Sequence, residues 1–167
     1  TTITVYGGTD YTLTSAGISN PMYSAQKSPI GFPMDPAKWT VKVTDTTSRF
    51  QSPPTLNVWY NLGSQSITVP IGIWNVDYTV HGYASLPGSD HYITLSTGAA
   101  TESNNEYSVR QDNTAGAVGI TSFKQFQLSA AVKTPYYLNT KTGTSGGILY
   151  NNNDQVKLVI RAVCAYL

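Results

Sequence analysis

Apolar and polar residues alternate strictly along several stretches of the chain, and this pattern constrains the fold most. Residues 74–81 read WNVDYTVH, and residues 56–62 read LNVWYNL. A period of two places successive side chains on opposite faces of a β-strand, so each stretch predicts a strand with one buried face. No stretch combines a 3.6-residue apolar stripe with helix caps, so the sequence predicts almost no helix.

Other stretches complete the set of expected strands. These are residues 3–6, 11–14, 39–44, 91–96, 107–110, 118–132 (expected to be broken), 136–139 and 156–167. About ten short strands separated by Gly-, Pro- and Asn-containing turns predict one all-β domain over residues 1–167, a sandwich or a barrel. Residues 15–38 contain four prolines and little alternation, and they are expected to form a long surface excursion.

Charged residues are scarce. Lys and Arg number 10, Asp and Glu number 9, and charged residues make up 11% of the chain, against about 25% in typical domains. This composition excludes nucleic-acid binding through a basic face, which needs clustered Lys and Arg. No apolar run approaches the roughly 18 residues of a membrane span, so membrane insertion is not expected. Because charged residues are scarce, most of the polar surface must consist of Ser, Thr, Asn, Gln and Tyr.

No metal site or cofactor is expected. Cys164 is the single cysteine, which excludes an internal disulfide and a cysteine-based metal cage. It lies in an apolar run, so we expect a buried free thiol. His81 and His91 bracket a Pro-Gly turn without an evident third metal ligand. The Asn/Asp-rich segments 112–113 and 151–154 lack EF-hand spacing and are expected to be turns.

Two glutamates could in principle form a glycosidase pair. Glu102 and Glu106 lie four residues apart in a loop rich in Asn and Ser. Glycoside hydrolysis needs two carboxylates held at a fixed spacing by rigid elements, and such a loop supports that spacing poorly. The sequence therefore predicts solvated loop carboxylates.

Residues 143–147 read GTSGG and resemble the nucleophile loop of chymotrypsin-like serine proteases, with Ser145 as nucleophile. The base would be His81 or His91, oriented by Asp90 or Asp112. Neither histidine has that family's sequence context, and the chain is short for two barrels. We therefore expect no catalytic residues, and a Ser145 protease is the enzymatic alternative.

Aromatic residues exceed what one small core requires, with 12 Tyr and 3 Trp. Trp59 lies on the polar face of its expected strand, between two asparagines. Aromatic rings stack on the apolar faces of sugars, while amides and hydroxyls bind sugar hydroxyls. Tyr and Trp are also favoured where subunits meet, so both interpretations stay open. For glycan contact we predict Trp59, Tyr83 and His91.

The last expected strand is apolar on both faces near its end. One face includes Cys164, and the other carries the apolar residues Val159, Val163, Ala165 and Leu167. A strand that is apolar on both faces must be covered on both sides. Another subunit could cover the second face, which makes these four residues interface candidates. Alternatively, the strand is a central core strand that ends the fold.

Residues 70–80 read PIGIWNVDYTV, residues 91–95 read HYITL, and the chain closes with YYL at 136–138, a Thr/Gly turn and the strand 156–167. This order of strands resembles the TNF/C1q-like jelly rolls that end many trimeric bacteriophage tail spikes and tail fibres. The resemblance covers residues 39–167. It implies a jelly-roll sandwich and a homotrimer with the last strand near its axis. The trimer would contact bacterial surface polysaccharide or another host receptor, or it would close and stabilise the spike. It carries over no catalytic residue.

The sequence thus predicts a non-catalytic head domain of a viral attachment fibre or tail spike, located on the virion, that binds a surface glycan and trimerises. The alternative from another class is a monomeric carbohydrate-binding module or adhesin lectin domain. That alternative predicts the same aromatic surface but no apolar second face on the terminal strand.

Overall fold

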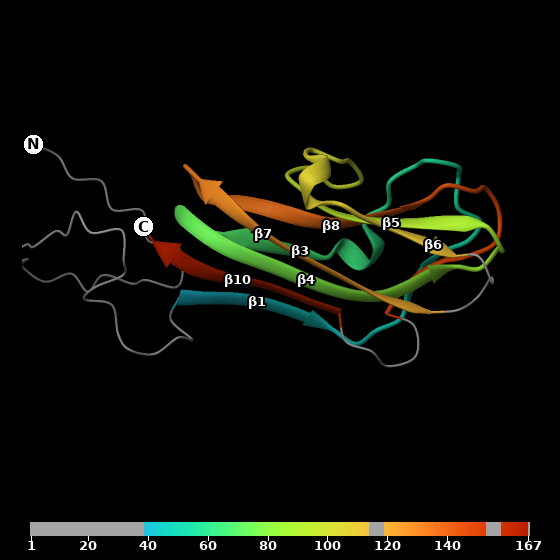
Figure 1. Cartoon of the computed structure of the whole chain (residues 1–167), viewed down its shortest axis with the longest axis horizontal. Helices are drawn as coiled ribbons and strands as arrows, with labels where there is room; N and C mark the ends of the chain where they lie inside the picture. Colours follow the sequence, from blue (N-terminus) through green and yellow to red (C-terminus); the bar gives the residue numbers. More distant parts are fainter. Residues whose placement is uncertain (1–38, 114–118, 153–157, 167) are drawn as a thin grey trace, which may run out of the picture.

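The computed structural model describes residues 39–113, 119–152 and 158–166, which form an all-β antiparallel sandwich of two sheets (Figure 1). Helical geometry in these ranges is restricted to short 3-10 turns, including Leu62–Ser64 and Asn105–Tyr107. The strands are β1 (Thr40–Asp45), β2 (Arg49–Gln51), β3 (Ser66–Val69), β4 (Gly72–Ala84), β5 (Ser89–Ser96), β6 (Val109–Asn113), β7 (Ile120–Ala130), β8 (Thr134–Thr142), β9 (Leu149–Asn151) and β10 (Leu158–Tyr166). The expected strands 3–6 and 11–14 and the excursion 15–38 lie outside these ranges.

The strand order is that of a jelly roll. One sheet runs β1-β10-β4-β7 and the other runs β3-β8-β5-β6. All pairs are antiparallel, and the chain crosses repeatedly between the sheets, as in two Greek keys. Strands β9 and β2 extend the first sheet, because β9 pairs with the end of β4 that β10 does not reach. The predicted sandwich with almost no helix is confirmed.

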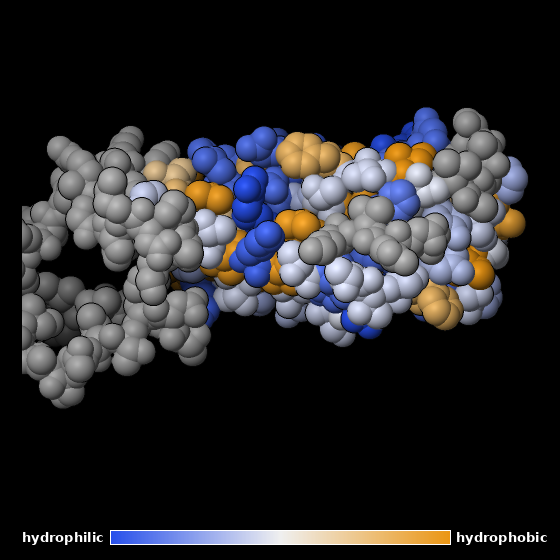
Figure 2. All heavy atoms as spheres, turned by 90° about the horizontal axis from the view of Figure 1, so that it is seen from below, coloured by the Kyte–Doolittle hydropathy of each residue, from blue (hydrophilic) through white to orange (hydrophobic). Residues whose placement is uncertain are grey.

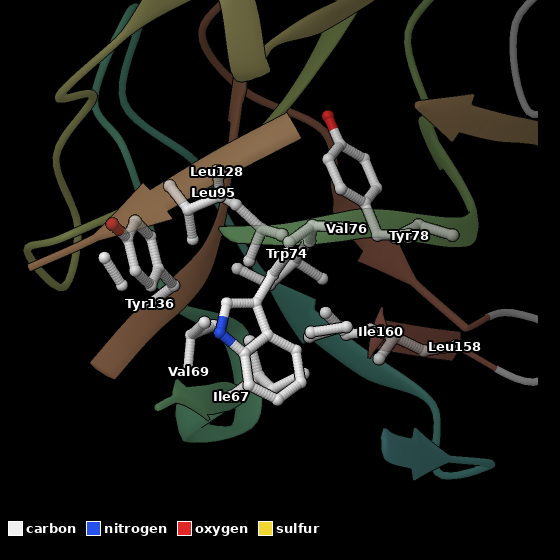
Figure 3. Close-up of a cluster of buried hydrophobic side chains, with 14 of the residues drawn as sticks. Ile67, Val69, Trp74, Val76, Tyr78, Leu95, Leu128, Tyr136, Leu158 and Ile160 are labelled. Atoms are coloured by element: carbon white, nitrogen blue, oxygen red, sulfur yellow. The ribbon is translucent and has the colours of Figure 1, made fainter. Parts of the chain in front are cut away.

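The inner face of β4 forms the middle of the core. Trp74, Val76, Tyr78 and Val80 are each at most 3% exposed, so the predicted alternation of residues 74–81 is confirmed. Figure 3 shows the Trp74 indole beside Ile67 of the opposite sheet. The core cluster draws on both sheets, so neither sheet could bury its apolar face without the other.

Strand β10 lies between β1 and β4 and is therefore central in its sheet. Its inner face, including Ile160 and Cys164, is buried, and burial raises the pKa of the Cys164 thiol. The predicted buried free cysteine is confirmed. On the outer face Val159 and Val163 are half-buried and flank Arg161.

Two strand predictions are wrong. Residues 56–62 do not form a strand: Asn57 has a φ of 58°, which interrupts the pleat, and only Tyr60 makes a bridge, to Thr140. The predicted break within 118–132 is also absent, because Ile120–Ala130 pairs continuously with β4. The alternation missed β2, β3 and β9, which are three or four residues long.

The buried phenol of Tyr78 is bound at its polar end. Its hydroxyl lies 2.7 Å from the Tyr107 carbonyl oxygen and 3.2 Å from that of Ile93. Burial raises the pKa of this phenol, so it stays neutral and donates. This hydroxyl ties the β4 core face to the connection that leads into β6.

Replacing Tyr78 by Phe should lower the free energy of unfolding by about 1–2 kcal/mol, because a buried carbonyl loses its donor while the ring volume is kept. Urea denaturation of Tyr78→Phe and of the control Tyr137→Phe measures this. The Tyr137 hydroxyl makes no hydrogen bond with another described residue, so its loss should change stability by less than about 0.5 kcal/mol. Equal effects of the two substitutions would contradict the anchoring role of Tyr78.

Candidate functional site

Two aromatic rings and a lysine meet on the outer face of the β3-β8-β5-β6 sheet. Tyr92 of β5 lies directly opposite Lys141 of β8. Trp59 lies beside them because the neighbouring Tyr60 exchanges both backbone hydrogen bonds with Thr140 of β8. The Lys141 Nζ atom is 4.5 Å from the Trp59 ring centroid and 4.9 Å from that of Tyr92. We call Trp59, Tyr92 and Lys141 the aromatic–lysine site.

The site is fixed by the sandwich core. On β5 and β8 the inward positions, such as Ile93 and Leu138, are fully buried. The pleat then turns Tyr92 and Lys141 outward. All three side chains of the aromatic–lysine site are half-buried, so they present a partly ordered surface to solvent.

Arg110 of β6 continues the row across the sheet. It lies opposite Tyr92, and its guanidinium carbon is 5.8 Å from the Tyr92 ring centroid. It also forms ion pairs with Asp90 at 3.1 Å and with Asp112 at 3.0 Å. Cations and aromatic rings therefore alternate along the row in the order Arg110, Tyr92, Lys141 and Trp59.

The Tyr92 hydroxyl is part of the same network. It donates to Asp90 Oδ2 at 3.1 Å. Desolvation and this contact with Asp90 raise the pKa of Tyr92, so the phenol remains a donor at neutral pH. The ring is thus held at its hydroxyl end by Asp90 and on its two sides by Arg110 and Lys141.

A loop covers the outer face next to this row. Asn139, one outward position along β8 from Lys141, is fully buried because its amide donates to the carbonyls of Gly98 and Thr101 and accepts from Ala100 N–H. Figure 1 shows the connection between β5 and β6 lying over the sheet. The loop therefore borders the aromatic–lysine site on one side.

The three residues predicted to contact glycan do not come together. Trp59 lies in the aromatic–lysine site. Tyr83 lies on β4 in the other sheet, with its ring stacked on Tyr150 at 4.8 Å, and Phe50 follows at 5.8 Å. His91 is 1% exposed and faces the interior, so its expected place on the surface is wrong. Tyr92 and Lys141 were not predicted as site residues from the sequence.

The interior around His91 is polar. Its Nε2 atom lies 2.7 Å from Thr140 Oγ1, and a side chain on Gly82 would clash with the imidazole at 2.6 Å. Desolvation lowers the pKa of His91 from its ordinary 6.5 to about 4, against the opposing influence of the Gln111 and Asn151 amides.

The protease constellation is not assembled. Ser145 is exposed in the loop that follows β8. His91 binds Thr140 in the β3-β8-β5-β6 sheet. His81 lies in the other sheet, where its Nδ1 atom is 3.1 Å from Thr121 Oγ1. Within the described ranges no hydrogen bond joins Ser145 to either histidine.

Three other acidic residues considered in the sequence lie in exposed positions. Glu102 accepts a hydrogen bond from Ser108 Oγ, and Glu106 is exposed in the same connection. Asp112 is paired with Arg110. Among the described residues no group of three His, Cys, Asp or Glu side chains could hold a metal ion, and no helix is long and apolar enough to cross a membrane.

The predicted interface residues lie on the outer face of the first sheet. Val159, Val163 and Ala165 are half-buried there, and Leu167 lies outside the described residues. Arg161 Nε pairs with Asp77 Oδ1 at 2.9 Å between the two valines. Figure 2 views the molecule from the side on which β1 lies in Figure 1, and it shows separated hydrophobic patches crossed by a hydrophilic band.

The sequence matches no protein-family model and no curated protein. Among solved structures, the infectious bursal disease virus VP2 subviral particle is similar at 12% identity and a TM-score of 0.36, over 77% of this chain and 37% of that chain. The C-terminal CBM6 of LamC, a marine laminarinase from Zobellia galactanivorans, is similar at 18% identity and a TM-score of 0.31, over 74% and 98% of the two chains. TmCBM61, solved in complex with beta-1,4-galactotriose, gives 14% identity and a TM-score of 0.31, over 72% and 86%.

The buried His91 should make stability depend on pH. The pKa of His91 is about 4 in the folded chain and 6.5 in the unfolded chain. Between these pH values the unfolded chain therefore binds a proton that the folded chain does not bind. The free energy of unfolding should therefore fall as pH drops from about 6.5 to about 4, by about 3 kcal/mol in total. Urea denaturation from pH 7 to pH 4 measures this, and His91→Gln should remove most of that slope. The control His81→Gln changes a half-exposed histidine and should keep the slope; an unchanged slope in His91→Gln would refute the assignment.

Proposed function

We propose that this chain is a non-catalytic recognition domain that binds a surface glycan through the aromatic–lysine site. The observation that carries the proposal is the placement of Trp59 and Tyr92 on either side of Lys141, outside the core and beside a bordering loop. Aromatic faces, a phenol and carboxylate groups suit a sugar, which offers apolar ring faces and hydroxyl groups at once. Few charges elsewhere on the chain leave stacking and hydrogen bonding as the main sources of selectivity.

We further propose that the parent is a viral attachment fibre or tail spike on the virion, with host surface polysaccharide as the partner. The resemblance of residues 39–167 to tail-spike heads supports this, and the jelly-roll strand order is compatible with it. A monomeric lectin module is the competing proposal. The two proposals share the glycan site and differ in self-association.

Self-association through the outer face of β10 is supported by the two half-buried valines at that face. Val159 and Val163 flank an ion pair that occupies part of the surface between them. Such a mixed surface resembles the interfaces of many oligomers, which are only partly apolar. A homotrimer would place this face of each copy near the common axis.

Trp59→Ala should weaken binding to the recognised polysaccharide by about tenfold or more, because a central aromatic contact is lost. Binding to a panel of bacterial surface polysaccharides, followed by calorimetry on each hit, measures the effect. The matched control is Phe123→Ala, which removes an aromatic side chain that is 57% exposed on β7 of the other sheet. Full binding by Trp59→Ala, or equal losses in both variants, would contradict the proposed site.

Light scattering after size exclusion should give a mass three times 18.0 kDa for the unmodified protein. Val163→Glu should reduce the mass to one copy without changing the circular dichroism, because a charge would be buried between subunits. Ser145→Glu places the same charge in an exposed loop and should leave the mass unchanged. A single-copy mass for the unmodified protein would refute the trimer and favour the lectin module.

A further inference from the structure

Lys141 is a cation without a counterion in the described part of the chain. Its ammonium contacts two rings, yet no described carboxylate forms an ion pair with it and no described oxygen accepts a hydrogen bond from it. The side chain is half-buried. An ammonium has three donors, and two aromatic faces do not replace three acceptors.

The neighbouring charges are already paired. Arg110 binds both Asp90 and Asp112, so this trio carries one net negative charge. Arg110 and Asp112 lie on β6, across Tyr92 from Lys141, whereas Asp90 lies on β5 two residues from Tyr92. The row is therefore polarised, with an uncompensated cation on the Trp59 side and an acidic group on the β6 side.

The two rings also hold the ammonium in place. Cation–π contacts with Trp and Tyr are among the favourable ones, and they restrict a long side chain that would otherwise sample many rotamers. A donor that is restricted before the ligand arrives loses less conformational entropy on binding. Lys141 thus has the position and the free donors of a ligand-binding cation.

We propose that the aromatic–lysine site selects an acidic sugar whose carboxylate binds Lys141 and whose ring packs against Trp59. The sugar hydroxyls would then lie toward the acidic side of the row, where Asp112 is 66% exposed at its side chain and accepts hydrogen bonds. A carboxylate in the reverse orientation would meet the Arg110–Asp90–Asp112 trio, whose net charge is negative. This inference rests on the proposed glycan-binding function and adds the chemical class of the sugar.

The test compares oligosaccharides that contain glucuronic acid with the same oligosaccharides after carboxyl reduction to glucose. Calorimetry should give an affinity for the acidic form that is about tenfold or more above that for the reduced form. Lys141→Gln should remove this preference, and Lys141→Arg should keep part of it. The control Lys133→Gln removes an exposed lysine from the turn between β7 and β8 and should keep the preference.

Salt provides a second measurement that needs no variant. Binding of the acidic form by the unmodified protein should weaken when salt rises from about 50 to about 500 mM, because a partly exposed ion pair is screened. Binding of the reduced form should stay constant. This comparison tests the preference for an acidic sugar even if a Lys141 variant fails to fold.

The outcomes separate this inference from the proposed function. Equal binding of both forms, lost in Trp59→Ala, would overturn the acidic preference and retain the glycan site. Absence of binding by either form, together with no hit among the surface polysaccharides, would overturn both. An acidic preference that survives Lys141→Gln would assign the selecting cation to another residue and overturn the inference.

Discussion

The structure depends on the burial of one face of β4. This strand is 13 residues long and is bonded along one edge to β7 and along the other to β10 and then β9. Its inner side chains, from Trp74 to Val80, fill the space between the sheets. Because they can be buried only under the β3-β8-β5-β6 sheet, they fix which face of every paired strand points inward. A slip of one residue would exchange the two faces completely.

The candidate site is a consequence of that register. Ile93 and Leu95 must face β4, so Tyr92 must face outward, and its antiparallel partner Lys141 must face outward with it. Trp59 joins them because Tyr60 pairs with Thr140. None of these residues is needed to fill the core. The surface row is therefore free to vary in chemistry while the core holds its geometry, which is how a stable sandwich can carry a specific recognition surface.

The sequence predicted what depends on local periodicity and missed what depends on pairing between distant strands. WNVDYTVH predicted β4 because every second residue there is buried, whereas the similar LNVWYNL failed because Asn57 takes a positive φ. His91 is a different case: we predicted it as a glycan contact, although the pattern HYITL already places it on the same face as Ile93 and Leu95. Tyr92 and Lys141 are 49 residues apart, and no local signal could bring them together.

On a surface with few charges, a single charge without an ion-pair partner has a larger effect on which ligands bind. Charged residues make up 11% of this chain, and Arg49, Arg110 and Arg161 are each paired with aspartates. Pairing consumes the donors of a guanidinium and lowers what it offers to an incoming ligand. Lys141 instead contacts two aromatic faces. These stabilise its positive charge but, unlike a carboxylate, do not neutralise it. A ligand that carries its own carboxylate gives this ammonium a charge-assisted hydrogen bond, whereas a neutral sugar offers only hydroxyl acceptors, which bind an ammonium more weakly.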